Sequence, residues 1–171
     1  MAILKADTFR MGAPESEPGR EAVETLHLRN IGRTFAISTH EVTKAQFRVF
    51  QQANPDIQRI NVEQYSRTDD SPQIGMDWYE AAAYCNWLRK IEGIPEDQWC
   101  YLPNSDNKYA AGMQPAADYL TRTGYRLPTE SEWEFACRAG SVISRYYGLT
   151  ETLLPEYARY QDNSGGCPID C

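Results

Sequence analysis

The sequence contains no apolar run that approaches the ~20 residues of a membrane-spanning helix. Its first residues, Met1 to Phe9, also lack the continuous apolar segment of a signal peptide. Basic residues are few as well, because 17 Lys and Arg stand against 24 Asp and Glu and leave a net charge of −7. This balance disfavours nucleic acid and anionic membrane surfaces as partners. We therefore expect a soluble, cytoplasmic protein with no nucleic-acid partner and no membrane partner.

Metal-binding and disulfide-forming residues are also scarce. The two histidines, His27 and His40, stand without a cysteine or a second histidine at ligand spacing, so no zinc site is predicted. Five cysteines are too few and too scattered for the framework of a small disulfide-stapled protein, and their odd number leaves one unpaired. They are Cys85, Cys100, Cys137, Cys167 and Cys171.

The sequence does contain enough apolar material for a packed core. Hydrophobic residues make up 42% of the 171 positions, and aromatic residues make up 12%. This length is typical of one domain. Because no internal repeat, low-complexity tract or domain boundary is visible, a single domain over residues 1–171 is predicted.

The clearest helix signal lies at residues 126–140, RLPTESEWEFACRAG. Thr129 and Glu132 have the spacing of a capping box, in which each side chain accepts a hydrogen bond from the other residue's backbone N–H. Gly140 is placed to adopt the left-handed conformation that ends a helix. These signals together predict a helix that begins just after Thr129 and ends before Gly140.

The side chains of this helix divide into an apolar face and a group of carboxylates. Trp133, Ala136 and Cys137 share the face that we expect to pack into the core. The carboxylates are candidates for general acid–base chemistry, but capping and the helix dipole already account for them, and no nucleophile stands beside them. We therefore assign them a structural role. They are Glu130, Glu132 and Glu134.

Two further helices are predicted by the same start signal. Thr43 and Gln46 form a capping box at the start of residues 42–54, where Phe47 and Phe50 face the core.

The second of these helices covers residues 75–93 and begins with Asp77 and Glu80. Its apolar residues recur at helical spacing and are expected to pack into the core. They are Ala81, Tyr84, Cys85, Leu88 and Ile91.

Short alternating segments predict three strands, at residues 8–11, 26–29 and 34–38. The second and third are expected to pair as a hairpin around residues 30–33. Residues 145–148 and 156–160 read as loop and short-strand material.

A long segment at residues 94–125 separates two of the predicted helices and is rich in Pro, Asn, Asp and aromatic residues. Linkers rarely carry so many aromatic residues, so an ordered, self-packed loop is predicted. Two interpretations of its role remain open: it lines a binding surface, or it only shields the helices.

The signature RLPTESEWEFACRAG closely resembles that of the formylglycine-generating enzyme family, also called the sulfatase-modifying-factor domain. Further segments agree with this family in the same order along the chain. They are FRMG (9–12), FAISTHEVT (35–43), GMDWYEAAAYCNWL (75–88) and YARYQDNSGG (157–166).

This resemblance implies an α+β fold of the C-type-lectin-like kind. In it, two main helices pack on short, mostly antiparallel strands with much irregular structure. The family's C-terminal segments find no counterpart here, so the resemblance implies a single truncated domain at 1–171.

The resemblance also implies an activity. The family oxidises a specific sulfatase cysteine to formylglycine, using molecular oxygen and copper held by two enzyme cysteines near the C-terminus. That segment is not found here, so we expect copper for full-length catalytic relatives but no cofactor, metal ligand or catalytic residue in this chain. Cys167 and Cys171, at C-x3-C spacing, are a conceivable replacement pair, but an adventitious tail is the favoured interpretation.

Two other sites of the family are affected. Cys85 and Cys137 align with cysteines that form disulfides in secreted members, and here we expect both to be small buried residues. A calcium-binding Asn of the family is replaced by Arg159 in Tyr157-Ala158-Arg159-Tyr160, so calcium is not expected there.

Three functions follow from the resemblance. The first is a formylglycine-generating-enzyme-like domain that is inactive as this chain, with a sulfatase-type protein or peptide as its partner. The second is a non-catalytic, lectin-like binding module of a bacterial signalling or multidomain protein. The third, an iron-dependent sulfoxide synthase, requires an added His-rich domain and is disfavoured because the sequence has two histidines.

Overall fold

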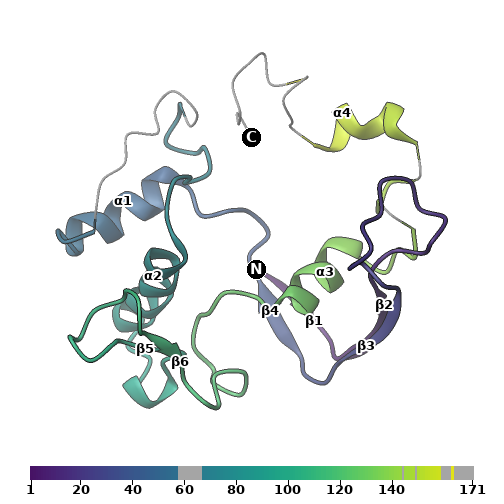
Figure 1. Cartoon of the computed structure of the whole chain (residues 1–171). Coiled ribbons are helices and arrows are strands. Elements are labelled where there is room, and N and C mark those ends of the chain that lie inside the picture. Colours follow the sequence, from purple (N-terminus) through teal and green to yellow (C-terminus); the bar gives the residue numbers. More distant parts are fainter. Residues whose placement is uncertain (58–66, 144, 149, 159–162, 164–171) are drawn as a thin grey trace. The chain divides into compact units, whose positions relative to one another are not determined.

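The computed structural model describes residues 1–57, 67–143, 145–148, 150–158 and 163 (Figure 1). They form two compact units. One, here named the strand unit, contains Met1–His40 and Pro128–Ala158, and the other, the helix unit, is built around Glu41–Leu127. The prediction of a single domain stays a prediction.

Two antiparallel strand pairs form the framework of the strand unit. Strand β1 (Ala2–Leu4) pairs with β4 (Phe35–Ile37), and β2 (Asp7–Met11) pairs with β3 (His27–Ile31). The three predicted strands are therefore present, but the predicted hairpin between the second and third is wrong. Each of these two strands pairs instead with an N-terminal strand.

Helix α3 (Glu130–Arg138) packs on β2 and β3. The ring of Phe135 in α3 lies 5.3 Å from that of Phe9 in β2 and 6.4 Å from that of Phe35 in β4. The single side chain of Phe135 thus contacts both strand pairs. Such a contact joins positions far apart in sequence, so local alternation did not reveal it.

Helix α3 begins as its sequence predicts. The Thr129 side chain accepts a hydrogen bond from the backbone N–H of Glu132, and the Glu132 carboxylate accepts one from the N–H of Thr129. The helix ends with two left-handed residues, Ala139 at φ 47° and Gly140 at φ 84°. The expected left-handed Gly140 is present, and Ala139 shares the role of ending the helix.

The predicted core face of α3 is wrong for Trp133 and Cys137, while Ala136 is half-buried. Trp133 is 59% exposed and Cys137 is also exposed, whereas the buried residues are Ser131 and Glu132. The half-buried Phe135 supplies the aromatic contact that Trp133 was expected to make. Polar residues occupy the buried face because distant residues of the strand unit supply their partners.

Two capped helices form the framework of the helix unit. Helix α1 (Lys44–Ala53) has the capping box of Thr43 and Gln46, and helix α2 (Trp78–Ile91) has that of Asp77 and Glu80. Both boxes match the sequence prediction.

The contact between these helices is aromatic. Phe47 and Phe50 of α1 are 1% exposed, as predicted, and their ring centroids lie 5.5 and 5.4 Å from that of Tyr84 in α2. Trp87 adds a ring 5.6 Å from that of Phe50. These four rings fix α1 on α2.

The buried face of α2 differs in part from the prediction. Tyr84 and Cys85 are buried as expected, but Ile91 is 59% exposed, and two polar residues, Asn86 and Arg89, are almost fully buried. A polar residue stays buried only when it is hydrogen-bonded, and the partners here come from residues 94–125.

Residues 94–125 are ordered and complete the core of the helix unit. They contain a short 3₁₀ helix, η1 (Glu96–Gln98), and an antiparallel pair of β5 (Tyr101–Leu102) and β6 (Gln114–Pro115). The cluster around Ala82 and Cys85 of α2 includes three buried residues of this segment, which are Cys100, Tyr101 and Met113. Ala116 of the segment is also buried. The prediction of an ordered, packed segment is confirmed. The two interpretations of its role, lining a binding surface or only shielding the helices, stay predictions.

Residues 145–148 form a loop, as predicted, but residues 156 and 157 are helical rather than loop or strand, and residues 159 and 160 lie outside the described residues. A 3₁₀ turn, η2 (Glu151–Leu153), leads into helix α4 (Leu154–Tyr157). In the part of the chain that the structure describes, no helix combines the length and the apolar character needed to cross a bilayer.

The packing of α3 predicts a contrast between two of its aromatic residues. We expect Phe135→Ala to lower the free energy of unfolding by about 2–3 kcal/mol, because the ring contacts both strand pairs. Trp133→Ala, on the exposed face, should change it by less than about 0.5 kcal/mol. Urea denaturation of both variants measures the difference, and a larger loss for Trp133→Ala would restore the sequence-based assignment of the core face.

Candidate functional site

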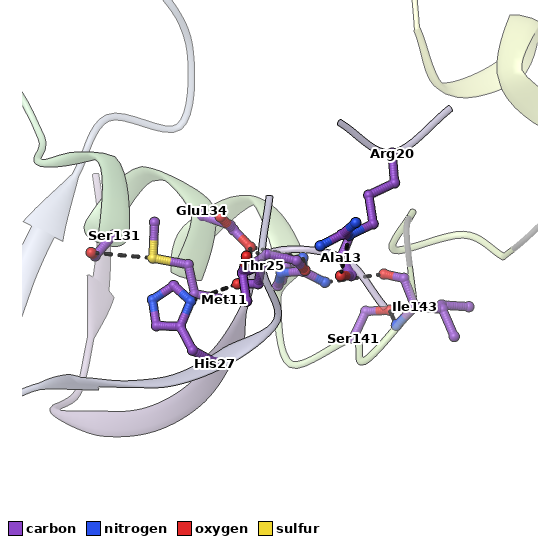
Figure 2. Close-up of polar contacts among 11 residues, drawn as sticks. Met11, Ala13, Arg20, Thr25, His27, Ser131, Glu134, Ser141 and Ile143 are labelled. Atoms are coloured by element: carbon purple, nitrogen blue, oxygen red, sulfur yellow. Dashed lines mark hydrogen bonds and ion pairs between the residues drawn. The ribbon is translucent and has the colours of Figure 1, made fainter. Parts of the chain in front are cut away.

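The signature helix α3 holds the backbone of Gly12, directly after β2, through two of its side chains. Figure 2 shows one of them, Glu134, beside Met11 and Ala13, the neighbours of Gly12 in the chain. The Gly12 N–H donates to Oε1 of Glu134 at 2.8 Å, and Nη2 of Arg138 donates to the Gly12 carbonyl at 2.6 Å. Arg138 also pairs with Glu134 at 2.7 Å. The pair thus satisfies both backbone groups of Gly12, and we name these three residues the Gly12 clamp.

Gly12 is required at this position for two reasons. Its φ is +89°, a conformation that side chains disfavour. A Cβ there would also lie 2.5 Å from the carbonyl oxygen of Thr25. The backbone conformation of Gly12 in the clamp and the close approach of the Thr25 carbonyl therefore both require a residue without a side chain at position 12.

The first turn of α3 binds the strands through polar contacts as well. Ser131 donates to the sulfur of Met11 at 3.4 Å and accepts from Nε of Arg29 at 3.0 Å. The fully buried Glu132 pairs with Arg33 at 2.6 Å. The carboxylates of Glu132 and Glu134 thus serve the structural role that the sequence indicated.

In the helix unit, buried side chains of α2 hold the segment 94–125. Asn86 donates to the carbonyl of Tyr101 at 2.7 Å and to the hydroxyl of Tyr109 at 2.8 Å. Arg89 donates to the carbonyl of Gln98 at 2.8 Å and to that of Tyr125. Two polar residues of one helix thus fasten the segment at its beginning, middle and end.

A pocket of about 500 Å³ lies in the helix unit between α1, α2 and this segment. We name it the aromatic pocket, because its largest side chains are Phe50, Trp87, Trp99 and Tyr109. The other residues that line it are Ala53, Asn54, Ile57, Ala83, Asn86, Lys90 and Ile91. The segment 94–125 thus packs on α2 and also contributes Trp99 and Tyr109 to the wall of this pocket.

The described cysteines do not fit a copper site. Cys85 is 8% exposed and Cys100 is fully buried, and burial raises the pKa of the Cys85 thiol to about 12. A thiol with such a pKa stays protonated at neutral pH, whereas a metal binds the thiolate. Cys137 is exposed rather than buried as expected, and within the described chain no group of three His, Cys, Asp or Glu residues is placed to hold a metal ion.

Two sequence-based hypotheses fall outside the described residues. The pair Cys167 and Cys171 lies there, and so do Arg159 and Tyr160 of the possible calcium segment. Of that segment, Tyr157 is described, and its ring stacks on that of Tyr147 at 4.5 Å beside a smaller cavity of about 230 Å³. Cys137 also lines this cavity.

Short antiparallel strands and capped helices in the two described units give the chain an α+β fold. The profile of the sulfatase-modifying factor enzyme 1-like domain matches residues 1–166. The chain belongs to this family.

Curated relatives carry the name formylglycine-generating enzyme. The protein of Mycobacterium tuberculosis is 26% identical over 170 residues, which cover 86% of this chain and 54% of that protein. The protein of Thermomonospora curvata is 29% identical over 161 residues, which cover 85% of this chain and 51% of that protein. The chain thus spans about half the length of these relatives.

Solved structures share the fold. The variable protein 1 of Treponema denticola superposes with a TM-score of 0.72 at 22% identity, over 95% of this chain and 61% of that one. PvdO of Pseudomonas aeruginosa superposes with a TM-score of 0.61 at 22% identity, over 92% of this chain and 52% of that one. The predicted family and the predicted α+β fold are confirmed.

The Gly12 clamp predicts unequal effects of two glycine substitutions. Gly12→Ala should lower the free energy of unfolding by about 2–3 kcal/mol, since it adds strain and a clash with Thr25. Gly19 has a similar φ of +78°, but a Cβ added there would meet nothing within 4 Å, so Gly19→Ala should cost only about 1 kcal/mol. Denaturation midpoints measure both, and equal losses would show that the close approach to Thr25 has no energetic weight.

The burial of the thiols predicts a labelling pattern. In a variant with Cys167→Ser and Cys171→Ser, iodoacetamide should modify Cys137 in the native protein and leave Cys85 and Cys100 unmodified, because the latter two are buried. In denaturant all three should react. Peptide mass spectrometry identifies the sites, and rapid native labelling of Cys85 would contradict the described core.

Proposed function

We propose that this chain acts as a formylglycine-generating-enzyme-like domain that binds a cysteine-containing protein segment of the sulfatase type and does not itself oxidise it. The family and the names of the relatives support the substrate class. The observation that carries the second half of the proposal is the burial of Cys85 and Cys100 in the core of the helix unit.

The chemical argument concerns the source of oxidising power. Side chains alone do not supply oxygen chemistry, which requires a metal or another cofactor. In the catalytic relatives that cofactor is expected to be copper on two cysteine thiolates. Cys85 and Cys100 are committed to packing, and Cys137 stands on another unit of the chain. Within the described residues the domain therefore offers a scaffold and a surface, and we derive no step through copper.

A second candidate function is a binding module for a protein partner unrelated to sulfatases. Exposed aromatic side chains in the strand unit favour it, since aromatic residues are enriched at protein interfaces. Trp133 is 59% exposed, Tyr146 54% and Tyr157 51%. The two candidates differ only in the partner, so binding to a sulfatase peptide separates them.

The proposal predicts binding without turnover. The purified chain, incubated in air with copper and a cysteine-containing sulfatase peptide, should leave the peptide thiol unchanged by mass spectrometry. The same peptide with Ser in place of its Cys, labelled with a fluorophore, should bind in a saturable manner by anisotropy. A scrambled peptide is the matched control.

Each outcome is informative. Conversion of the thiol to an aldehyde that is lost in the Cys167→Ser/Cys171→Ser variant would contradict the proposal and make those residues a metal site. Absence of peptide binding would favour the second candidate. The formylglycine-generating enzyme of M. tuberculosis, assayed in parallel, controls for the quality of peptide and copper.

A further inference from the structure

The aromatic pocket has walls that are fixed before any ligand arrives. The indole N–H of Trp99 donates to the carbonyl of Ile94 at 3.2 Å. The ring of Trp87 lies 5.6 Å from that of Phe50 and 5.7 Å from that of Tyr84. Rings held in this way lose little conformational entropy when a ligand packs on them, which favours binding.

The opposite wall is fixed by α2. The hydroxyl of Tyr109 accepts a hydrogen bond from Nδ2 of Asn86 at 2.8 Å. Because Tyr109 belongs to the segment 94–125, this bond joins the segment to α2 at the wall of the pocket. The volume of about 500 Å³ falls within the ~300–1,000 Å³ of small-molecule sites.

Two polar groups define what the pocket accepts. Asn86 is 2% exposed, and its Oδ1 has no hydrogen-bond partner among the described residues. An unpaired buried acceptor is costly, and a ligand N–H that reached it would remove that cost. Lys90, an exposed cation, is the one charged side chain among the described residues that line the pocket.

We propose that the aromatic pocket binds a small aromatic carboxylate that carries an N–H donor. The ring packs among Trp87, Trp99 and Tyr109, the N–H approaches Oδ1 of Asn86, and the carboxylate meets Lys90. The absence of any acidic side chain among the described lining residues leaves this anion unopposed. This inference is independent of the proposed function, because it uses neither a cysteine nor a peptide segment.

Indole-3-acetate is a suitable probe, because it carries an aromatic ring, one N–H and one carboxylate. Titration of the full chain by calorimetry should give saturable binding with one site and a Kd on the order of 0.1–1 mM. Tryptamine, which replaces the anion by a cation, should bind at least about tenfold more weakly. Benzofuran-3-acetate, which lacks the N–H, should also bind more weakly.

Two pocket variants and one control test whether the probe binds in the pocket. Lys90→Glu should weaken the binding of indole-3-acetate by about five- to tenfold. Lys108→Glu is the matched control, since Lys108 is exposed in the same unit and does not line the pocket, and it should bind like the parent chain. Trp99→Leu should abolish measurable binding, with circular dichroism to verify that each variant is folded.

The proposal is overturned if indole-3-acetate does not bind, or if tryptamine binds equally well. It is also overturned if folded Lys90→Glu binds like Lys108→Glu. Equal affinity for benzofuran-3-acetate would remove the N–H requirement and with it the role given to Asn86. Loss of sulfatase-peptide binding without loss of indole-3-acetate binding would count against the proposed function alone.

Discussion

The strand unit depends on one buried carboxylate, that of Glu132. It closes the capping box of α3 with Thr129 and, at the same time, pairs with Arg33, which follows β3. A fully buried charge is tolerated only when it is paired and hydrogen-bonded, so α3 begins stably only where that arginine is delivered. The start of α3 and the position of the chain after β3 therefore depend on each other, because both are held by the carboxylate of Glu132. The Gly12 clamp repeats this logic at the other end of the helix, where Glu134 and Arg138 hold the end of β2.

The sequence predicted the helices better than their faces. The capping boxes of α1, α2 and α3 are local, because each lies within four residues, and all three are present. The buried faces of α2 and α3 contain polar residues whose partners are distant in sequence. Ser131, for example, meets Arg29 from 102 positions away. An apolar pattern points to Trp133 and Cys137 instead, because it carries no information about such partners.

The same limit applies to the strands and to the candidate site. Alternation located the strands that include Phe9 and Phe35, but it did not reveal which strands pair or that both rings contact Phe135 of α3. The aromatic residues of 94–125 indicated an ordered segment. The aromatic pocket itself was not predicted, since it requires Trp87 of α2 and Trp99 of the segment to face one hollow. The only feature of the sequence that pointed toward this pocket was the number of aromatic residues in 94–125.

The burial of Arg89 constrains how this domain changes over evolutionary time. The guanidinium is fully buried, its acceptors are carbonyls of the segment 94–125, and Gly124 leaves the room that it occupies, because a Cβ there would clash with it. A shorter segment would leave the buried guanidinium of Arg89 without its carbonyl acceptors. A larger residue at position 124 would occupy the space that the guanidinium fills. We therefore expect Arg89, Gly124 and the length of the segment to change together among homologues.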